Sequence, residues 1–427
     1  MIKLDVYNKV KELNDYIINL RREFHEQPET SLQEHRTKKV IKQELSKANI
    51  SYEDIEAGGI IGYINGEHKG KTIVLRADID ALPIKESSEN LLNVKESISK
   101  IEGKAHMCGH DGHTAMLLGA AKILSQHKNQ LNGNVLLAFE QGEEKGQGVY
   151  KLLKRLLEIG ADGVWGIHLK SDLQAGKISV EPGARMASAC SFDVLIEGKS
   201  GHASRPDLAI SPIDCFYDFY GRFKDIKNKY LNPFDPITFS VGSVQAGKTG
   251  NVIPGKLRFQ GTIRYLNYKQ GLKAEEKFRE ILKKTTEMNN CHYEYLRSPS
   301  AKDSTIYNHP GCSTIAENAV KKTLGKKYLK KHPIWMASDT YSYYLRYFPG
   351  VYAFLGIKNE ELGTGAEHHN PKFDLDESAL KNGTAITVQY TLDFLNNKKP
   401  IVFTEEKESL HSLFVKNKGY IPSDKKE

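Results

Sequence analysis

Short apolar runs that alternate with longer amphipathic stretches restrict the fold of this 427-residue chain more than any other feature. The runs 72–75, 135–139 and 164–167 are bounded by glycine or polar residues and predict strands. The stretches 114–126 and 149–158 have apolar residues at helical spacing. Strands that alternate with helices form a mostly parallel sheet covered on both faces. The sequence therefore predicts an α/β fold with such a sheet flanked by helices.

From about residue 187 the pattern changes. The expected elements are strand 191–196, a helix opening at Ser211-Pro212, strands 237–244 and 256–265, a second helix, and strand 292–296. This β-α-β-β-α-β order is the split βαβ, or ferredoxin-like, arrangement. We therefore expect a smaller α+β domain inserted into the larger one. The expected domains are 1–186 and 299–398 for the larger domain, 187–298 for the insertion, and 399–427 for a charged C-terminal extension.

Composition excludes several classes of protein. The 61 Lys+Arg against 53 Asp+Glu give a net charge of only +8, and the basic residues are scattered, so we expect no nucleic-acid partner. No apolar run approaches the roughly 18 residues of a membrane span, and residues 1–16 lack a signal-like apolar region, so we expect no membrane partner. The five cysteines are widely spaced and odd in number, which favours a reducing compartment and a cytoplasmic protein.

The densest group of reactive side chains is His106-Met-Cys108-Gly-His110-Asp111-Gly-His113. A cysteine and a histidine two residues apart can reach one metal ion if the backbone turns sharply, and the intervening glycine permits that turn. Asp111 is a candidate to orient an imidazole from behind. The alternative for His113 is simple packing at the start of a helix.

Three further groups follow predicted strands. Glu143 and Glu144 come just after strand 135–139, where one carboxylate can bind a metal while the other accepts a proton, although such a pair can also be a solvated loop. His168 ends strand 164–167, where a packed core histidine is the alternative. Asp78 and Asp80 follow strand 72–75, either to orient metal ligands or to stabilise a turn.

The positions of these groups favour a shared site. The carboxyl edge of an open α/β sheet is where sites form, and the loop 367–371, with its two histidines, follows the last strand. A set of one cysteine, several histidines and glutamate suits zinc or another borderline divalent ion. The donors exceed the needs of one tetrahedral ion, so we expect two metal ions about 3.5–4 Å apart that share a water.

Several motifs together resemble a known family. In order, they are RADIDALPI, HMCGHDGHTAMLLGAA, GEE, GIH, GKSGHASRP, GNVIP and HHNPKFDLDE. Their order and rough spacing resemble the metal-dependent, metallopeptidase-like amidohydrolases that include aminoacylases, hippurate hydrolases and plant auxin-amino-acid conjugate hydrolases. The resemblance spans about residues 20–395, nearly the whole chain.

The resemblance implies roles for individual residues. It assigns metal binding to Cys108, His110, Glu144, His168 and His369, with Cys108 as the bridging thiolate. It assigns the general base to Glu143. This chain has His368-His369-Asn370 where many relatives have Leu-His-Ser, so His368 competes with His369 as a ligand.

The resemblance also makes the inserted domain a lid. It assigns contacts with the substrate carboxylate or the oxyanion to His202, Asn251 and Arg264 of the lid. In relatives the lid forms the homodimer contact, so His202 is a candidate to act across it. The tail beyond Lys398 exceeds the usual end of the family.

The expected function is metal-dependent hydrolysis of an amide bond in a small N-acyl amino acid or dipeptide-like substrate. A metal-activated water would attack, with Glu143 as general base and His202 at the oxyanion. We expect two divalent ions per subunit, zinc or manganese, with cobalt or nickel also suited, and a homodimer formed through the lid.

Two other functions stay open. The segment 242–249, from Gly242 to Thr249, fits the GxxxxGK[ST] pattern of a P-loop nucleotidase. The residues after Lys248 include Gly250, Pro254 and Gly255, which do not favour the helix that a P-loop requires. The second alternative is a metal-free cysteine hydrolase that uses Cys108 with His110 or His113.

Overall fold

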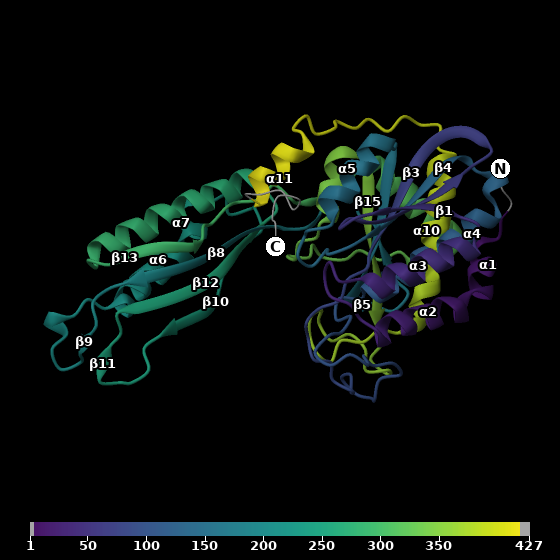
Figure 1. The fold of residues 1–427 in the computed structure, drawn as a ribbon. Coiled ribbons are helices and arrows are strands. Elements are labelled where there is room, and N and C mark those ends of the chain that lie inside the picture. The colour runs from purple at the N-terminus through teal and green to yellow at the C-terminus, as the bar shows by residue number, and fades with distance from the viewer. Residues whose placement is uncertain (1–3, 419–427) are drawn as a thin grey trace.

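The computed structural model describes residues 4–418; residues 1–3 and 419–427, the latter being the end of the expected extension, lie outside the described part. The chain forms two bodies that meet at one end of each (Figure 1). The larger body is built on a seven-stranded sheet with the order β1-β2-β4-β3-β5-β15-β6. Its strands are β1 (Ser51–Ile55), β2 (Gly59–Asn65), β3 (His68–Asp78), β4 (Asn132–Glu140), β5 (Gly163–Gln174), β6 (Ile178–Ser179) and β15 (Gly350–Lys358).

The four central strands of this sheet, β4, β3, β5 and β15, run parallel, while β1, β2 and β6 are antiparallel additions. Helices cover both faces. One face carries α1 (Val6–Glu12), α2 (Asn14–Glu26), α3 (His35–Lys47), α4 (His110–Gln126), α8 (Pro310–Thr323) and α10 (Leu380–Leu395). The other carries α5 (Val149–Ile159) and α9 (Tyr341–Tyr347). The predicted α/β class is confirmed.

The central strands have few polar residues because both of their faces are buried. In β3, Ile73 and Leu75 pack under α4 and α10, whereas Val74 between them packs under α5 and α9. In β4, Leu137 and Leu136 divide in the same way. The alternation places two separate cores on the two sides of one sheet.

The smaller body is the inserted lid. Its elements are β8 (Ser188–Glu197), α6 (Pro212–Tyr230), β10 (Ile237–Ala246), β12 (Lys256–Tyr265), α7 (Tyr268–Met288) and β13 (His292–Arg297). The four strands form an antiparallel sheet with the order β10-β12-β8-β13, and α6 and α7 cover one face. Phe219 and Phe223 of α6 meet Phe278 of α7 in its core. The predicted split βαβ insertion is confirmed.

A small two-stranded sheet, β9 (Gly201–His202) with β11 (Val252–Ile253), forms the end of the lid farthest from the larger body (Figure 1). At the opposite end, the segment by which the chain enters the lid lies beside the segment by which it leaves. The Ser188 Oγ lies 2.9 Å from the Thr305 Oγ1 and accepts the Ser304 N–H at 3.0 Å. A second short sheet, β7 (Gly183–Met186) with β14 (Ile306–Asn308), continues this junction into the larger body.

The C-terminal extension packs at the same junction. Its helix α11 (Leu410–Lys418) buries Leu413 and Phe414 against the α5 and α9 side of the larger body. The Asn417 Oδ1 accepts the N–H of Asp303, which lies in the segment that leaves the lid. Among residues 4–418, no helix combines the length and the apolar character needed to cross a bilayer.

Candidate metal centre and active site

The sheet and the start of α4 bring the candidate residues together. Asp78 ends β3, and His168 lies within β5, one strand away. His110 is the first residue of α4 and follows Gly109, whose φ of 91° is in the left-handed region. A Cβ at Gly109 would also lie 2.9 Å from the Leu169 side chain. The glycine therefore makes the sharp turn that aims Cys108 and His110 at the sheet edge.

The five candidate ligands fall into two overlapping groups. The ligand atoms of Cys108, His110 and His168 lie within 4.8 Å of one another, and so do those of Cys108, Glu144 and His369. The Cys108 Sγ is 3.7 Å from the His168 Nε2, and the His369 Nε2 is 3.4 Å from the Glu144 Oε1. Because Cys108 belongs to both groups, the arrangement has the form of two adjoining sites with one shared thiol.

Two buried polar atoms in this space have no hydrogen bond. The His110 Nε2 and the Glu144 Oε1 are buried without a hydrogen-bond partner and lie 3.8 Å apart. A buried polar atom without a partner is costly, so such atoms indicate a missing ligand. Imidazole, carboxylate and thiol donors are those of zinc and similar divalent ions. The residues present therefore fit a pair of divalent cations.

The electrostatics of Cys108 agree with a cation site. Burial and the nearby carboxylate of Glu144 raise the pKa of the Cys108 thiol well above its ordinary value. A free thiolate is therefore disfavoured in the protein alone, which weakens the metal-free cysteine hydrolase. A bound cation removes this obstacle because a coordinating thiol is deprotonated.

Asp80 and Asp78 hold the histidines from behind. The Asp80 Oδ1 lies 3.2 Å from the His110 Nδ1, while its Oδ2 accepts the Ser31 hydroxyl at 2.6 Å and the Glu144 N–H at 3.1 Å. The Asp78 Oδ1 lies 2.5 Å from the His113 Nδ1. The Nε2 of His113 accepts the Leu169 N–H at 2.9 Å, so both nitrogens of His113 are engaged within the protein.

Asp111 has different partners. Its Oδ2 lies 2.8 Å from both the Arg21 Nε and the His25 Nδ1. Burial alone would raise the pKa of Asp111, but Arg21 and His25 hold it below its ordinary value. Asp111 thus orients an imidazole, as expected, but that imidazole belongs to His25 and not to a candidate ligand.

The two histidines of the loop 367–371 are placed differently. The His369 Nε2 faces Glu144. The backbone N–H of His369 donates to the Met107 carbonyl at 2.8 Å. The His368 ring is buried against Trp335, at 4.7 Å between ring centroids, and its Nε2 accepts the Ser171 N–H at 3.4 Å. The geometry favours His369 over His368 as the candidate ligand.

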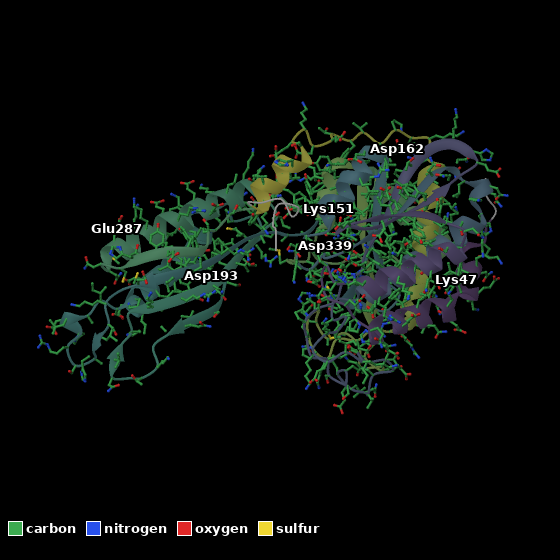
Figure 2. All side chains as sticks on the ribbon, in the orientation of Figure 1. Lys47, Lys151, Asp162, Asp193, Glu287 and Asp339 are labelled. Carbon is green, nitrogen blue, oxygen red and sulfur yellow. The ribbon has the colours of Figure 1, made fainter. Side chains whose placement is uncertain are left out.

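Glu143 lines a cavity of about 370 Å³ together with Glu144, His369 and Asp339. Its Oε1 accepts the Thr340 N–H at 2.9 Å. Burial, Asp339 and Glu144 raise the pKa of Glu143 well above its ordinary value. The cavity opens where the two bodies meet, near the Asp339 label of Figure 2.

A buried ion cluster that sequence reasoning missed supports this cavity. Arg76 donates to Glu140 at 2.9 Å, to Asp78 at 2.8 Å and to the Thr340 Oγ1 at 2.9 Å. The same Thr340 holds Glu143 through its N–H. An arginine inside the apolar β3 and a glutamate at the end of β4 were the available signals, because buried charges occur in pairs.

The structure does not bring all the lid residues to the cavity. Arg264 lines it and donates to the Ser338 Oγ at 3.0 Å. His202 is exposed in β9, at the far end of the lid, with its Nδ1 2.7 Å from the Ser204 Oγ. The Asn251 carbonyl accepts the Ala203 N–H in that same region. Neither His202 nor Asn251 lines the cavity in a single chain.

The segment 242–249 does not have the surroundings of a P-loop. It runs along β10 to a turn at Gly247, whose φ is 65°, and the next regular element is the short strand β11. Within this described segment no helix begins after Lys248. The helix N-terminus that would bind the phosphates is therefore missing.

Comparison with known proteins shows the family of the chain. Residues 74–393 match the model of the peptidase family M20/M25/M40. The chain belongs to that family. As an M20 amidohydrolase or peptidase it is an enzyme, and the family expected from the motifs is confirmed.

Curated M20 relatives with different names are similar over almost the whole chain. Thermostable carboxypeptidase 2 of Saccharolobus solfataricus is 32% identical over 406 residues, covering 91% of this chain and 98% of that protein. IAA-amino acid hydrolase ILR1-like 5 of Arabidopsis thaliana is 31% identical and covers 91% and 88%. N-acetylcysteine deacetylase of Bacillus subtilis is 32% identical and covers 87% and 94%.

Solved structures agree. The Bacillus subtilis YXEP protein, described as a dinuclear metal-binding peptidase of the M20 family, superposes with a TM-score of 0.73 at 29% identity, over 90% of this chain and 99% of that one. A putative aminohydrolase from methicillin-resistant Staphylococcus aureus superposes with a TM-score of 0.79 at 26% identity, over 92% and 100%.

Proposed function

We propose that this M20 enzyme hydrolyses the amide bond of small N-acyl amino acids or dipeptides, with Cys108, His110, Glu144, His168 and His369 holding two divalent cations. The observation that carries the proposal is the convergence of the ligand atoms of these five side chains beside Glu143. Two of the five, Glu144 and His369, also line the cavity with Glu143. The substrates after which two of the relatives are named, IAA-amino acid conjugates and N-acetylcysteine, are of this kind.

The chain's own residues move the proton. Bound divalent cations would supply the positive charge that acidifies water and polarises an amide carbonyl. Glu143 accepts the proton of the attacking water and later delivers it to the leaving amine. The Thr340 N–H fixes one carboxylate oxygen of Glu143 at 2.9 Å and leaves the other free for this proton.

The lid contributes substrate contacts. Arg264 lines the cavity and is proposed to bind the substrate carboxylate. His202 and Asn251 lie at the far end of the same lid, so we propose that they reach the cavity of a second subunit in a homodimer, where His202 stabilises the oxyanion. Zinc or manganese suits the donor set. Five unpaired cysteines support a cytoplasmic location.

The first test is the Glu143→Ala variant. We expect its turnover of N-acyl amino acids to fall by about 10²–10⁴-fold, because a general base contributes that much. Its metal content, measured by elemental analysis, stays at the wild-type level because Glu143 is not among the five ligands. Full activity in this variant would place the base elsewhere.

Chelation separates the metal enzyme from the cysteine hydrolase. We expect exhaustive chelation to abolish activity and zinc, manganese or cobalt to restore it. Activity that survives chelation but is lost on treatment with a thiol reagent would favour a nucleophilic Cys108 instead.

A further inference from the structure

Three cationic side chains form the lid-side wall of the catalytic cavity. Arg264 comes from the end of β12, Arg297 from the end of β13, and Lys302 from the segment that leaves the lid. Arg264 is opposite Ala189 in the β12–β8 register, and the Lys302 N–H donates to the Ala189 carbonyl at 3.2 Å. The three thus lie at the root of the lid, meaning the end that joins the larger body. Glu143, Glu144 and His369 line the same cavity from the larger body.

These cations form no direct ion pair within the described part of the chain. Among residues 4–418, no ion pair joins Arg264, Arg297 or Lys302 to a carboxylate, and the one side-chain hydrogen bond of Arg264 goes to the neutral Ser338 Oγ. The neighbouring Arg258 is different, because it pairs with Asp193 at 2.6 Å. Burial lowers the pKa of Lys302, and the charges of Arg297 and Arg264 lower it further. The wall therefore carries three positive charges that no carboxylate pairs with directly, although Arg297 lies across from Asp193, whose pKa is lowered by Arg258 and also by Arg297.

That charge exceeds what one carboxylate requires. A single carboxylate is satisfied by one bidentate arginine. Arg297 is exposed and Lys302 is partly buried, so this wall offers two further cations that a second anion could bind. Because Arg264 in this wall is proposed to bind the substrate carboxylate, the leaving amino acid would face the wall and the amide carbonyl would face Glu143.

We propose that Arg297 and Lys302, together with Arg264, select substrates whose leaving amino acid carries a second carboxylate: N-acyl aspartates and glutamates, or dipeptides that end in these residues. The inference rests on the proposed function and narrows it. Arg264 binds one carboxylate, while Arg297 and Lys302 bind the other. The amide itself lies between this wall and Glu143.

Binding to the metal-loaded Glu143→Ala protein tests the selection without turnover. Isothermal titration compares N-acetyl-L-glutamate with its neutral isostere N-acetyl-L-glutamine. We expect the glutamate compound to bind about tenfold or more tightly, as for a charge-assisted contact. Adding Lys302→Met, or separately Arg297→Gln, is expected to bring the two affinities together.

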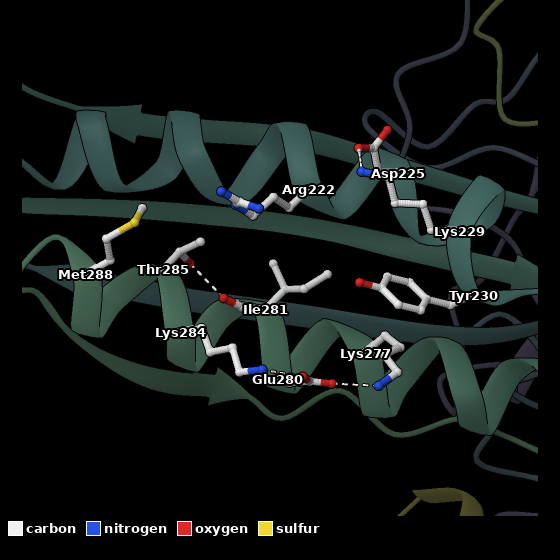
Figure 3. Close-up of a pocket in the computed structure, with 10 residues that line it drawn as sticks. All are labelled: Arg222, Asp225, Lys229, Tyr230, Lys277, Glu280, Ile281, Lys284, Thr285 and Met288. Atoms are coloured by element: carbon white, nitrogen blue, oxygen red, sulfur yellow. Dashed lines mark hydrogen bonds and ion pairs between the residues drawn. The ribbon is translucent and has the colours of Figure 1, made fainter.

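The matched control is Lys284→Met. Lys284 lies on α7 in the groove between α6 and α7, where it pairs with Glu280 (Figure 3), and does not line the cavity. This variant keeps the glutamate preference. Circular dichroism establishes that each variant is folded, and the two independent substitutions guard against a single misfolded protein.

Three results would overturn the proposal. The first is equal affinity for the two compounds or a lack of glutamate binding; the second is a preference that survives both substitutions. The third is that N-succinyl-L-alanine, which carries its second carboxylate on the acyl side, binds more tightly than N-acetyl-L-glutamate. If the wild-type enzyme hydrolyses N-acyl amino acids that have neutral side chains, the proposed amidohydrolase activity still stands. The two proposals can therefore fail separately.

Discussion

His369 has a backbone φ of 63°, in the left-handed region that non-glycine residues adopt only at a cost. The hydrogen bond from its N–H to the Met107 carbonyl ties this strained residue to the segment that carries Cys108. The strain and the hydrogen bond together aim the half-exposed imidazole at Glu144. The ring of His368, one residue earlier, packs against Trp335.

The two histidines are therefore expected to respond differently to substitution. His369→Ala lowers metal content, measured by elemental analysis after dialysis, while the free energy of unfolding of the metal-free protein changes by less than about 0.5 kcal/mol. His368→Ala removes a buried ring and lowers that free energy by about 1–3 kcal/mol, with less effect on metal content. The reverse pattern would make His368 the ligand.

Glu34 gives a prediction for pH. Its carboxylate is buried, accepts hydrogen bonds from the Gly142 N–H at 2.8 Å and the Gln141 side chain at 2.9 Å, and has its pKa raised from 4.5 to about 7 by burial and by Asp80. Between these values the folded protein holds a proton that the unfolded chain has released. The free energy of unfolding therefore falls as pH rises through this window.

Removing the ionisable group removes this dependence. From pH 4.5 to pH 8, the free energy of unfolding of the Glu34→Gln variant is expected to gain up to about 3 kcal/mol relative to that of the wild type. Urea denaturation at several pH values measures the difference. The exposed Glu56→Gln serves as the control, and a constant difference for Glu34→Gln would contradict the expectation.

Residues in distinctive motifs could be predicted from the sequence, and generic ones could not. Cys108 and His110 stand out because cysteine and histidine at that spacing around a glycine are chemically unusual. Arg297 at the end of a strand and Lys302 in a linker are ordinary surface residue types, and they form a cavity wall only when the lid packs on the larger body. The choice between His368 and His369 likewise depended on a backbone conformation that spacing does not reveal.

At the scale of elements, α11 joins the two bodies from outside. Phe414 stacks on Tyr343, with ring centroids 4.5 Å apart, and meets Tyr150 at 5.0 Å on the larger body. On the other side, the Lys416 ammonium lies 5.0 Å from the centre of the Tyr268 ring at the start of α7. The helix therefore stabilises the junction from which the lid extends.

We expect Phe414→Ala to lower the free energy of unfolding by about 3–5 kcal/mol, because it removes a fully buried aromatic side chain. Val415→Ala, at a position of the same helix that is 43% exposed, is the matched control and changes it by less than about 0.5 kcal/mol. Chemical denaturation measures both. Equal effects would show that α11 does not contribute to the core.

The extents of the central strands were harder to predict than their existence. The apolar run 164–167 predicts only the first part of β5, which continues to Gln174. Lys170 and Ser171 are polar but buried within this strand. The Lys170 ammonium lies 4.6 Å from the centre of the Trp335 ring and 2.6 Å from Asp172, so its burial depends on partners distant in sequence and on an adjacent acid. A pattern of apolar residues along the sequence does not predict that a lysine is buried through such contacts.

At the scale of the whole molecule, the lid is long enough to separate its own functional residues. Arg264 lies at its root beside the cavity, and His202 lies at its far end. A homodimer in which each lid reaches the neighbouring subunit would unite them. The proposed roles of Arg264 and His202 therefore predict a homodimer.

Subunit mixing tests that demand. Glu143→Ala and His202→Ala homodimers are each expected to be nearly inactive. After mixing and exchange, heterodimers have one site with both residues intact, so about a quarter of wild-type activity returns. Size-exclusion chromatography with light scattering verifies the dimer. Activity that stays absent after verified exchange would mean that His202 acts within its own chain.

The junction at Ser188, Ser304 and Thr305 has an evolutionary consequence. The chain enters the lid after β7 and leaves it before β14, and these two strands pair with each other, so the lid is a cassette inserted at one place in the larger body. Every candidate metal donor lies outside that cassette, whereas Arg264, Arg297 and Lys302 lie inside it. Exchange of the lid at this junction would therefore replace the proposed substrate contacts, His202 among them, while the candidate metal ligands and Glu143 stay in place.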